Sequence, residues 1–221
     1  MLCSGIGSVG NASRSVKIHC TAMSPQKRKY ELRRRAEGME ATRRRIAEAA
    51  MELHGSVGPA RTTMSAVAER AGVQRHTLYR HYPTEEALFG ACSAMFWEHA
   101  PPPDAAAWRS IPDAGERLSV GLDEAYRYYE QAAPMLAGIE RDREYIPGVD
   151  RHIAPFETFL EQAVDALAAG WGARGARARL VRTAVRHALA FETWDSLVGD
   201  GGATRAQAVE LMRALVAQAA S

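Results

Sequence analysis

The feature that most constrains the fold is a pair of short helical segments separated by only three residues, 71–73. Thr63 is of the type that caps helix N-termini, so it predicts the start of the first segment. Gly72 supplies the left-handed backbone conformation that a tight turn needs, and Leu78 of the second segment, 74–81, fills the small core beneath. This spacing is typical of a helix-turn-helix, whose second helix lies in the major groove of DNA.

The remainder of the chain has the same periodicity. From about residue 40, apolar residues recur with helical spacing and no run alternates as a β-strand does, so the sequence predicts an all-α fold. Helices are expected over 41–54, 84–99, 113–132, 134–144, 151–169, 175–198 and 204–219. We predict a disordered basic N-terminal arm over 1–38, a three-helix helix-turn-helix DNA-binding domain over 39–84, and a C-terminal helical bundle over 85–221.

The charge is distributed unevenly along the chain. Residues 1–90 hold 15 Lys/Arg and 8 Asp/Glu, a balance of +7, whereas residues 91–221 hold 13 and 18, a balance of −5. A basic segment joined to an acidic one predicts that the first part meets a polyanion and the second does not. Whether the arginine triplet Arg43, Arg44 and Arg45 contacts DNA or only solvates the start of a helix is left open by the sequence.

Other patterns predict an intracellular regulator without a cofactor. Three cysteines without metal-ligand spacing fit a reducing compartment, and we expect a cytoplasmic protein with no membrane segment. The GxGxxG match at 5–10 lacks a preceding strand and a following helix, so it is read as part of a flexible leader. Translation starts at Met1, Met23 or Met39 are all compatible with the sequence. We expect no metal and no enzymatic activity, because no paired acid and base or nucleophile stands out.

Residues 42–89, TRRRIAEAAMELHGSVGPARTTMSAVAERAGVQRHTLYRHYPTEEALF, resemble bacterial transcriptional regulators of the tetracycline-repressor (TetR) family. The positions that carry the resemblance are Thr63, Ala68, Gly72, Val73, Leu78, Tyr79, Tyr82 and Leu88. The resemblance implies a homodimer with an N-terminal DNA-binding domain and a C-terminal ligand-binding and dimerisation domain. The segment RHALAFETWDSL, 186–197, is similar to the penultimate helix of some members.

Carried over position by position, the resemblance implies a set of DNA contacts. Gln74, Arg75 and His76 are expected to read bases, since Gln pairs with adenine and Arg with guanine. Contacts to phosphate are expected from Thr63, Thr77, Tyr79 and His81. Two positions depart from the family pattern: many members have Gly where this chain has His76, and Lys where it has Glu85. The first departure puts the operator preference in doubt, and the second puts one phosphate contact in doubt.

The C-terminal half has aromatic and other large residues at helical spacing, from which we select candidates for ligand binding. Such a stripe is usually core, and His187 is either a core histidine or a group that orients a ligand in an apolar pocket. The candidates are Tyr126, Tyr129, Phe156, Phe159, His187, Phe191 and Trp194. Cys92, between small apolar residues, is expected to be a buried side chain rather than a redox sensor.

The sequence thus predicts a ligand-responsive transcriptional regulator, more often a repressor in the family it resembles. It is expected to form a homodimer through residues 175–219 and to bind a palindromic double-stranded DNA operator. An unidentified small-molecule effector is expected to release it from the DNA. The alternative is a constitutive DNA-binding regulator whose bundle only dimerises and binds no effector. A drug-sized cavity would distinguish the two.

Overall fold

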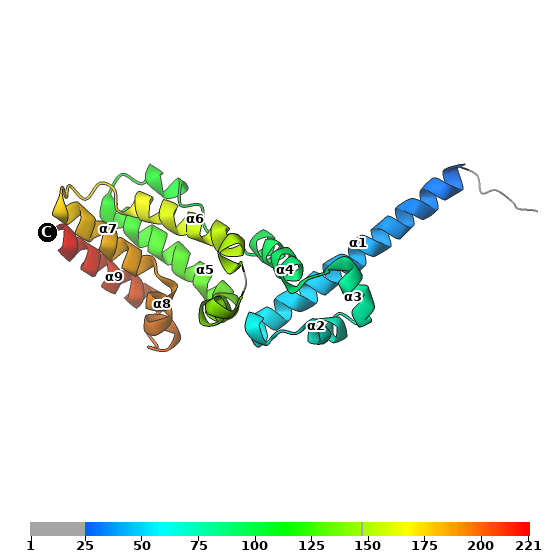
Figure 1. Ribbon diagram of the computed structural model, residues 1–221. Coiled ribbons are helices and arrows are strands. Elements are labelled where there is room, and N and C mark those ends of the chain that lie inside the picture. Colours follow the sequence, from blue (N-terminus) through cyan, green and yellow to red (C-terminus); the bar gives the residue numbers. More distant parts are fainter. Residues whose placement is uncertain (1–24, 147) are drawn as a thin grey trace, which may run out of the picture. The chain divides into compact units, whose positions relative to one another are not determined.

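The computed structural model describes residues 25–146 and 148–221, and every regular element in this part of the chain is helical (Figure 1). The all-α prediction is confirmed. None of the helices described is long and apolar enough to cross a membrane. The elements are, in order, α1 Pro25–Ser56, η1 Pro59–Arg61, α2 Met64–Arg70, α3 Arg75–His81, α4 Glu85–His99, η2 Ala107–Ser110, α5 Ala114–Asp142, η3 Arg143–Tyr145, α6 Val149–Leu167, α7 Ala176–Leu189, α8 Phe191–Trp194, the π-helical turn η4 Asp195–Gly199, and α9 Arg205–Ala220.

The first helix begins earlier than its apolar face suggests. We expected it at residue 41, after a disordered arm over 1–38, whereas α1 starts at Pro25. The prediction of disorder is therefore wrong for residues 25–38, and its remainder, with the GxGxxG match, lies outside the described residues. Arg, Lys, Glu, Leu and Ala dominate this stretch and favour a helix without any packing, and Arg33 and Glu37 form an i,i+4 ion pair at 2.8 Å.

The chain divides into two compact units, one ending at Glu40 and the other formed by Ala41–Ser221. In the second unit, the helix-turn-helix is built on one hydrophobic cluster. Ile46 of α1, Val67 of α2 and Leu78 of α3 are fully buried in it. The cluster also includes Met135, Ile139, Val149 and Ile153 from α5 and α6, so the DNA-binding head and the C-terminal helices share apolar contacts.

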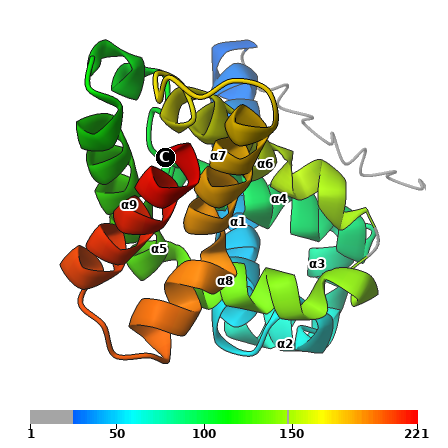
Figure 2. The ribbon, with the colours of Figure 1, turned by 90° about the vertical axis from the view of Figure 1, so that its left-hand side faces the viewer.

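A larger cluster holds the C-terminal helices together around α5. Leu118, Leu122, Tyr126 and Tyr129 of α5 are fully buried, and α6, α7 and α9 pack around them. Helices α5, α7 and α9 lie side by side (Figure 2). The bundle therefore has a central helix rather than four equivalent ones.

Two predicted boundaries in the bundle are wrong. A break was expected near Pro134, since proline removes a helix hydrogen bond, but α5 runs through it from Ala114 to Asp142. Conversely, a single helix was expected over 175–198, and the structure has a break at Ala190, whose ψ of 135° is extended. Neither outcome has a local cause in the sequence, because both depend on what α5 and α7 pack against.

Candidate DNA-binding surface and ligand pocket

The turn between α2 and α3 has the geometry that the sequence predicts. The Thr63 hydroxyl accepts the Ala66 N–H at 3.1 Å and caps α2. Gly72 has φ +62°, and the N–H of Val73 closes the end of α2 by donating to the Ala68 carbonyl at 2.9 Å. A left-handed residue at this position is the usual end of a helix, and it turns the chain directly into α3.

The residues proposed to read bases gather at the start of α3 and are solvent-exposed. Gln74 is the N-cap residue in an extended conformation, and its side chain makes no capping bond. The Arg75 guanidinium lies 5.7 Å from the centre of the Tyr79 ring, and its Nη2 is 3.5 Å from the Tyr79 hydroxyl. Stacking on the ring restricts the arginine and holds it on the exposed face of the helix. His76 is exposed beside it.

The residues predicted to contact phosphate differ in their solvent exposure. Thr63 and Tyr79 are exposed, the latter to 39%, whereas Thr77 and His81 are half-buried. All of them belong to α2, α3 or their caps, so the structure brings the predicted phosphate contacts into one region around the recognition helix.

The arginine triplet of α1 has three different environments. Arg43 lies over the Tyr82 ring at 5.2 Å, and Arg44 pairs with Glu48 at 3.0 Å. Arg45 donates from Nε to the Ala71 carbonyl at 2.9 Å, so it ties α1 to the end of α2. This bond gives Arg45 a role in holding the turn in place, which the charge pattern alone did not reveal.

Helix α4 follows the recognition helix after a short connection and leads into the bundle. The Thr84 hydroxyl accepts the Ala87 N–H at 3.1 Å and so caps the helix. Glu85 and Glu86 occupy the first turn, where a carboxylate favours the helix dipole. Glu86 also pairs with Arg151 of α6 at 2.9 Å, and this places a bundle residue against the start of α4.

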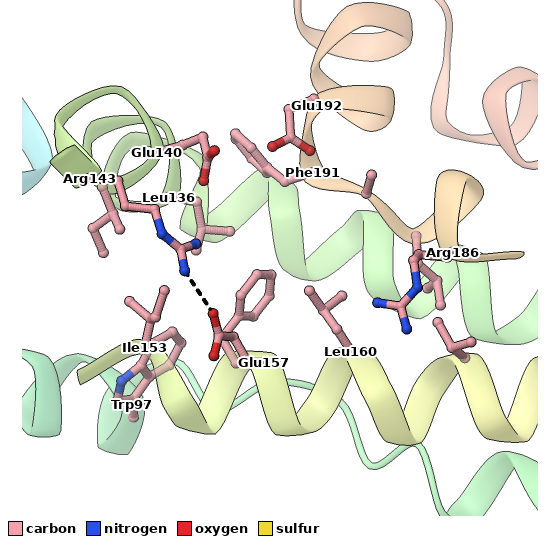
Figure 3. Close-up of a pocket in the computed structure, with 15 residues that line it drawn as sticks. Trp97, Leu136, Glu140, Arg143, Ile153, Glu157, Leu160, Arg186, Phe191 and Glu192 are labelled. Atoms are coloured by element: carbon pink, nitrogen blue, oxygen red, sulfur yellow. Dashed lines mark hydrogen bonds and ion pairs between the residues drawn. The ribbon is translucent and has the colours of Figure 1, made fainter. Parts of the chain in front are cut away.

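A pocket of about 250 Å³ lies in the bundle (Figure 3). The residues that line it come from α4, α5, α6, α7 and α8, among other elements. Trp97, in the C-terminal part of α4, forms part of its wall. The apolar lining consists of Trp97, Leu136, Ile139, Ile153, Phe156, Leu160, Val164, Leu189, Ala190 and Phe191, and the charged lining of Glu140, Arg143, Glu157, Arg186 and Glu192. A mostly apolar pocket with a few polar groups is the usual form of a small-molecule site.

Two of the seven predicted ligand residues, Phe156 and Phe191, line this pocket. The other five do not. Tyr126, Tyr129, Phe159 and Trp194 are buried in the core, and His187 is exposed on α7, with Nδ1 3.4 Å from the Thr193 hydroxyl. His187 therefore fits neither of the alternatives considered for it. Trp97 and the charged residues of the lining were missed, since their pattern resembles that of ordinary solvated helix faces.

The two buried tyrosines, Tyr126 and Tyr129, donate hydrogen bonds to backbone carbonyls instead of lining the pocket. Tyr126 donates its hydroxyl to the Ala188 carbonyl at 2.7 Å, and Tyr129 donates to the Leu189 carbonyl at 2.6 Å. Burial raises the pKa of both phenols well above the usual range, so they remain hydrogen-bond donors. They satisfy carbonyls at the end of α7 that the break at Ala190 leaves without helix partners.

Cys92 and His54 form a second buried polar pair, where α1 meets α4. The His54 Nδ1 lies 3.1 Å from the Cys92 Sγ, and the thiol also donates to the Phe89 carbonyl. Burial lowers the pKa of His54 to about 4 and raises the pKa of Cys92 to about 12. Both side chains are neutral near pH 7, and a neutral buried thiol is a poor nucleophile. The expectation that Cys92 is buried is confirmed.

A helix-turn-helix head with an exposed recognition helix, joined to a helical bundle that contains a pocket, defines this chain as a DNA-binding regulator. Residues 46–92 match the sequence model of a family described as bacterial regulatory proteins, tetR family. The DNA-binding head of this chain is therefore of the TetR type. A search of curated protein sequences gave no match.

Solved structures of bacterial transcriptional regulators share the fold over most of the chain. NalD of Pseudomonas aeruginosa, the secondary repressor of the MexAB-OprM multidrug efflux pump, aligns with a TM-score of 0.59 at 19% identity, over 83% of this chain and 97% of NalD. A TetR-like regulator from Rhodococcus sp. RHA1 gives 0.57 at 18% identity, covering 79% and 93%. FadR of Bacillus subtilis, solved with stearoyl-CoA, gives 0.53 at 20% identity, covering 80% and 97%.

Proposed function

We propose that the protein is a homodimeric repressor that acts in the cytoplasm, binds a palindromic operator and is released by a small molecule bound in the bundle pocket. The observation that carries this proposal is the exposed start of α3. The side chains of Gln74 and His76 have no hydrogen-bond partner within the described residues, and Arg75 is held by Tyr79 on the exposed face. Three polar side chains presented together at a recognition helix N-terminus are suited to reading base edges.

The contacts to the DNA backbone would come from the rim of the same surface. Thr63 uses its hydroxyl oxygen as a helix cap, and its O–H remains able to donate to a phosphate. Thr77, Tyr79 and His81 are proposed to do the same from α3, and Arg43 and Arg44 from α1. We assign Arg45 mainly to the turn, because its Nε already binds the Ala71 carbonyl.

Dimerisation is proposed through α7 and α9, within residues 175–219. Leu180 on α7 is 56% exposed, and Leu211 and Leu215 on α9 are 53% and 42% exposed. Large aliphatic side chains left exposed on neighbouring helices are typical of a surface that a second subunit covers. Two copies related by a twofold axis would present equivalent recognition helices, and this requires a palindromic operator.

The pocket is positioned to couple a ligand to the DNA-binding head by two routes. Trp97 of its wall belongs to α4, whose other end follows the recognition helix. Glu140 and Arg143 of its rim flank Asp142, and the Asp142 carboxylate accepts the Ala60 N–H of η1 at 3.0 Å, just before α2. A ligand that moves either element would change the placement of the head, and hence its fit to two operator half-sites.

The alternative, a constitutive regulator whose bundle only dimerises, is disfavoured by the pocket itself. A bundle needed only for dimerisation has no reason to leave about 250 Å³ open beside α4. The neighbouring structures include a repressor, NalD, and a regulator in complex with stearoyl-CoA, FadR, and so a ligand-responsive repressor is also the function that they favour by analogy.

The proposal is tested by selecting bound sequences from random duplex DNA with the full chain and then titrating the best sequence. We expect a palindrome, and Arg75→Ala should weaken binding by about 1 to 3 kcal/mol and relax preference at one position in each half-site. Arg70→Ala is the matched control, because Arg70 lies on α2 and pairs with Glu52 at 2.6 Å. An asymmetric single site, or equal losses for Arg75→Ala on specific and random DNA, would contradict the proposal.

A further inference from the structure

The charged rim of the pocket is not balanced. Three carboxylates and two guanidiniums line it, and both guanidiniums are already engaged. Arg143 pairs with Asp150 at 2.8 Å and with Glu157 at 3.0 Å, and Arg186 pairs with Glu161 at 2.7 Å. Each cationic group of the lining is therefore already paired with at least one carboxylate, which disfavours an anionic ligand.

Two carboxylates of the rim remain uncompensated. Glu140 of α5 and Glu192 of α8 have no hydrogen-bond or ion-pair partner among residues 25–146 and 148–221, and both are exposed. They lie at the same end of the pocket as Phe191 (Figure 3). A positive charge held at this end would be attracted by both carboxylates, whereas a negative charge would be repelled.

The pocket also has aromatic walls, and Trp97 lies across the pocket from the two carboxylates (Figure 3). Trp97 and Phe156 lie parallel, with ring centres 6.2 Å apart and an interplanar angle of 9°. Phe191 lies on the same side as Glu192, its neighbour in the chain. Aromatic faces attract organic cations through the ring quadrupole, and carboxylates beside such faces strengthen the attraction. The aliphatic residues of the lining accept an apolar body.

Behind this wall lie two buried polar atoms without partners. The Tyr128 hydroxyl and the Trp194 Nε1 make no hydrogen bond in the described part of the chain. The Tyr128 ring centre is 6.3 Å from that of Phe156, and the Trp194 ring centre is 5.4 Å from that of Phe191. Both polar groups can donate, so an acceptor on a ligand that displaces either phenylalanine would satisfy a group that is costly to leave unpaired.

We propose that the pocket binds compact organic cations, in which a tertiary or quaternary ammonium lies between Glu140 and Glu192 and an apolar body lies against Trp97, Phe156 and Phe191. The inference rests on the proposed function, since it names the chemical class of the effector for that same pocket. The volume of about 250 Å³ favours a single compact body over a long chain.

The test uses three probes that share a 4-phenylbutyl body and differ in the head group: trimethylammonium, the neutral tert-butyl isostere, and carboxylate. Binding to the full chain is measured by isothermal titration calorimetry. We expect the cation to bind at least about tenfold more tightly than the neutral isostere, and the carboxylate most weakly. Glu140→Gln and Glu192→Gln should each weaken the cation about threefold, and the double variant about tenfold, with the neutral probe unaffected.

The matched control is Glu144→Gln, which removes the same charge from an exposed residue of η3 that does not line the pocket. It should leave all three affinities unchanged. Equal or tighter binding of the neutral or anionic probe, no binding of any probe, or a loss in Glu144→Gln as large as in Glu140→Gln would each overturn the assignment. Melting temperatures and operator binding without ligand confirm that the variants are folded.

A separate readout distinguishes this inference from the proposed function. Operator affinity is measured with and without saturating cation. Weaker operator binding in the presence of the cation supports both the ligand class and the proposed function. If the cation binds with the expected dependence on Glu140 and Glu192 but leaves operator affinity unchanged, the ligand class stands and the effector-released repressor is refuted.

Discussion

The buried imidazole of His54 should make the protein less stable in mild acid. His54 is 5% exposed, lies 5.4 Å from the Phe89 ring centre and contacts the Cys92 thiol, and burial lowers its pKa from 6.5 to about 4. Below pH 6.5 the unfolded chain binds a proton at this residue, whereas the folded chain does not bind it until the pH approaches 4. Protons therefore favour the unfolded state, and the free energy of unfolding falls as the pH decreases through this window.

The size of the effect follows from the two pKa values. At pH 5, a site with a pKa of 6.5 unfolded and about 4 folded costs roughly 2 kcal/mol relative to pH 8, which for a chain of this size lowers the melting temperature by about 4 to 8 °C. Carboxylates with lowered pKa values act at lower pH. Asp142 starts from 3.8, so its stabilising contribution is intact at pH 5 and is lost only as the pH falls below that value.

The assay is urea denaturation between pH 8 and pH 5 for the wild type and for His54→Gln, with His76→Gln as the control on the exposed surface of α3. The variant at residue 54 has its own loss of stability at every pH, so the quantity compared is the change with pH. We expect that change to shrink by roughly 2 kcal/mol in His54→Gln and to persist in His76→Gln. The same change with pH in wild type and His54→Gln, or an NMR-determined pKa near 6.5 for His54, would refute the reasoning.

Three further predictions concern single contacts. Asp142→Ala should lower the free energy of unfolding by about 1 to 3 kcal/mol in urea denaturation, because the Ala60 N–H loses its acceptor, and Asp142→Asn should recover most of the loss. Tyr129→Phe should cost about 1 to 3 kcal/mol in the same assay by leaving the last carbonyl of α7 unpaired, whereas Tyr128→Phe, which removes a hydroxyl without a partner among the described residues, should cost little or nothing. Leu211→Glu should yield monomers in light scattering, and a dimer that survives this change would place the interface elsewhere.

The DNA-binding head was predictable from the sequence because its determinants are local. Thr63 and Thr84 each cap a helix through an N–H three residues ahead, and Gly72 is the residue type that a positive φ favours. A turn fixed within about four residues is visible in the sequence as a short pattern. The family match over residues 46–92 covers this same region.

The bundle was less predictable because its boundaries are set by packing between helices. Pro134 does not end α5, since that helix is buried on both sides of it, from Tyr129 to Ile139. An aromatic stripe shows which face of a helix points inward but not which neighbour it meets. Tyr126 and Tyr129 were accordingly placed in a ligand site, whereas they lie in the core one layer behind it.

The core layer that contains Tyr126 and Tyr129 explains how the pocket arises. The break at Ala190 leaves the Ala188 and Leu189 carbonyls without helix partners, and the hydroxyls of Tyr126 and Tyr129 supply the missing donors. With the end of α7 fixed in this way, the chain turns so that Phe191 and Glu192 lie at the pocket rather than continuing along α7. The aromatic residues of α5 therefore shape the pocket without lining it. For the effector site that we propose, selectivity would then depend on Phe191 and Glu192, so substitutions at these two residues should change it while the tyrosines that support them are retained.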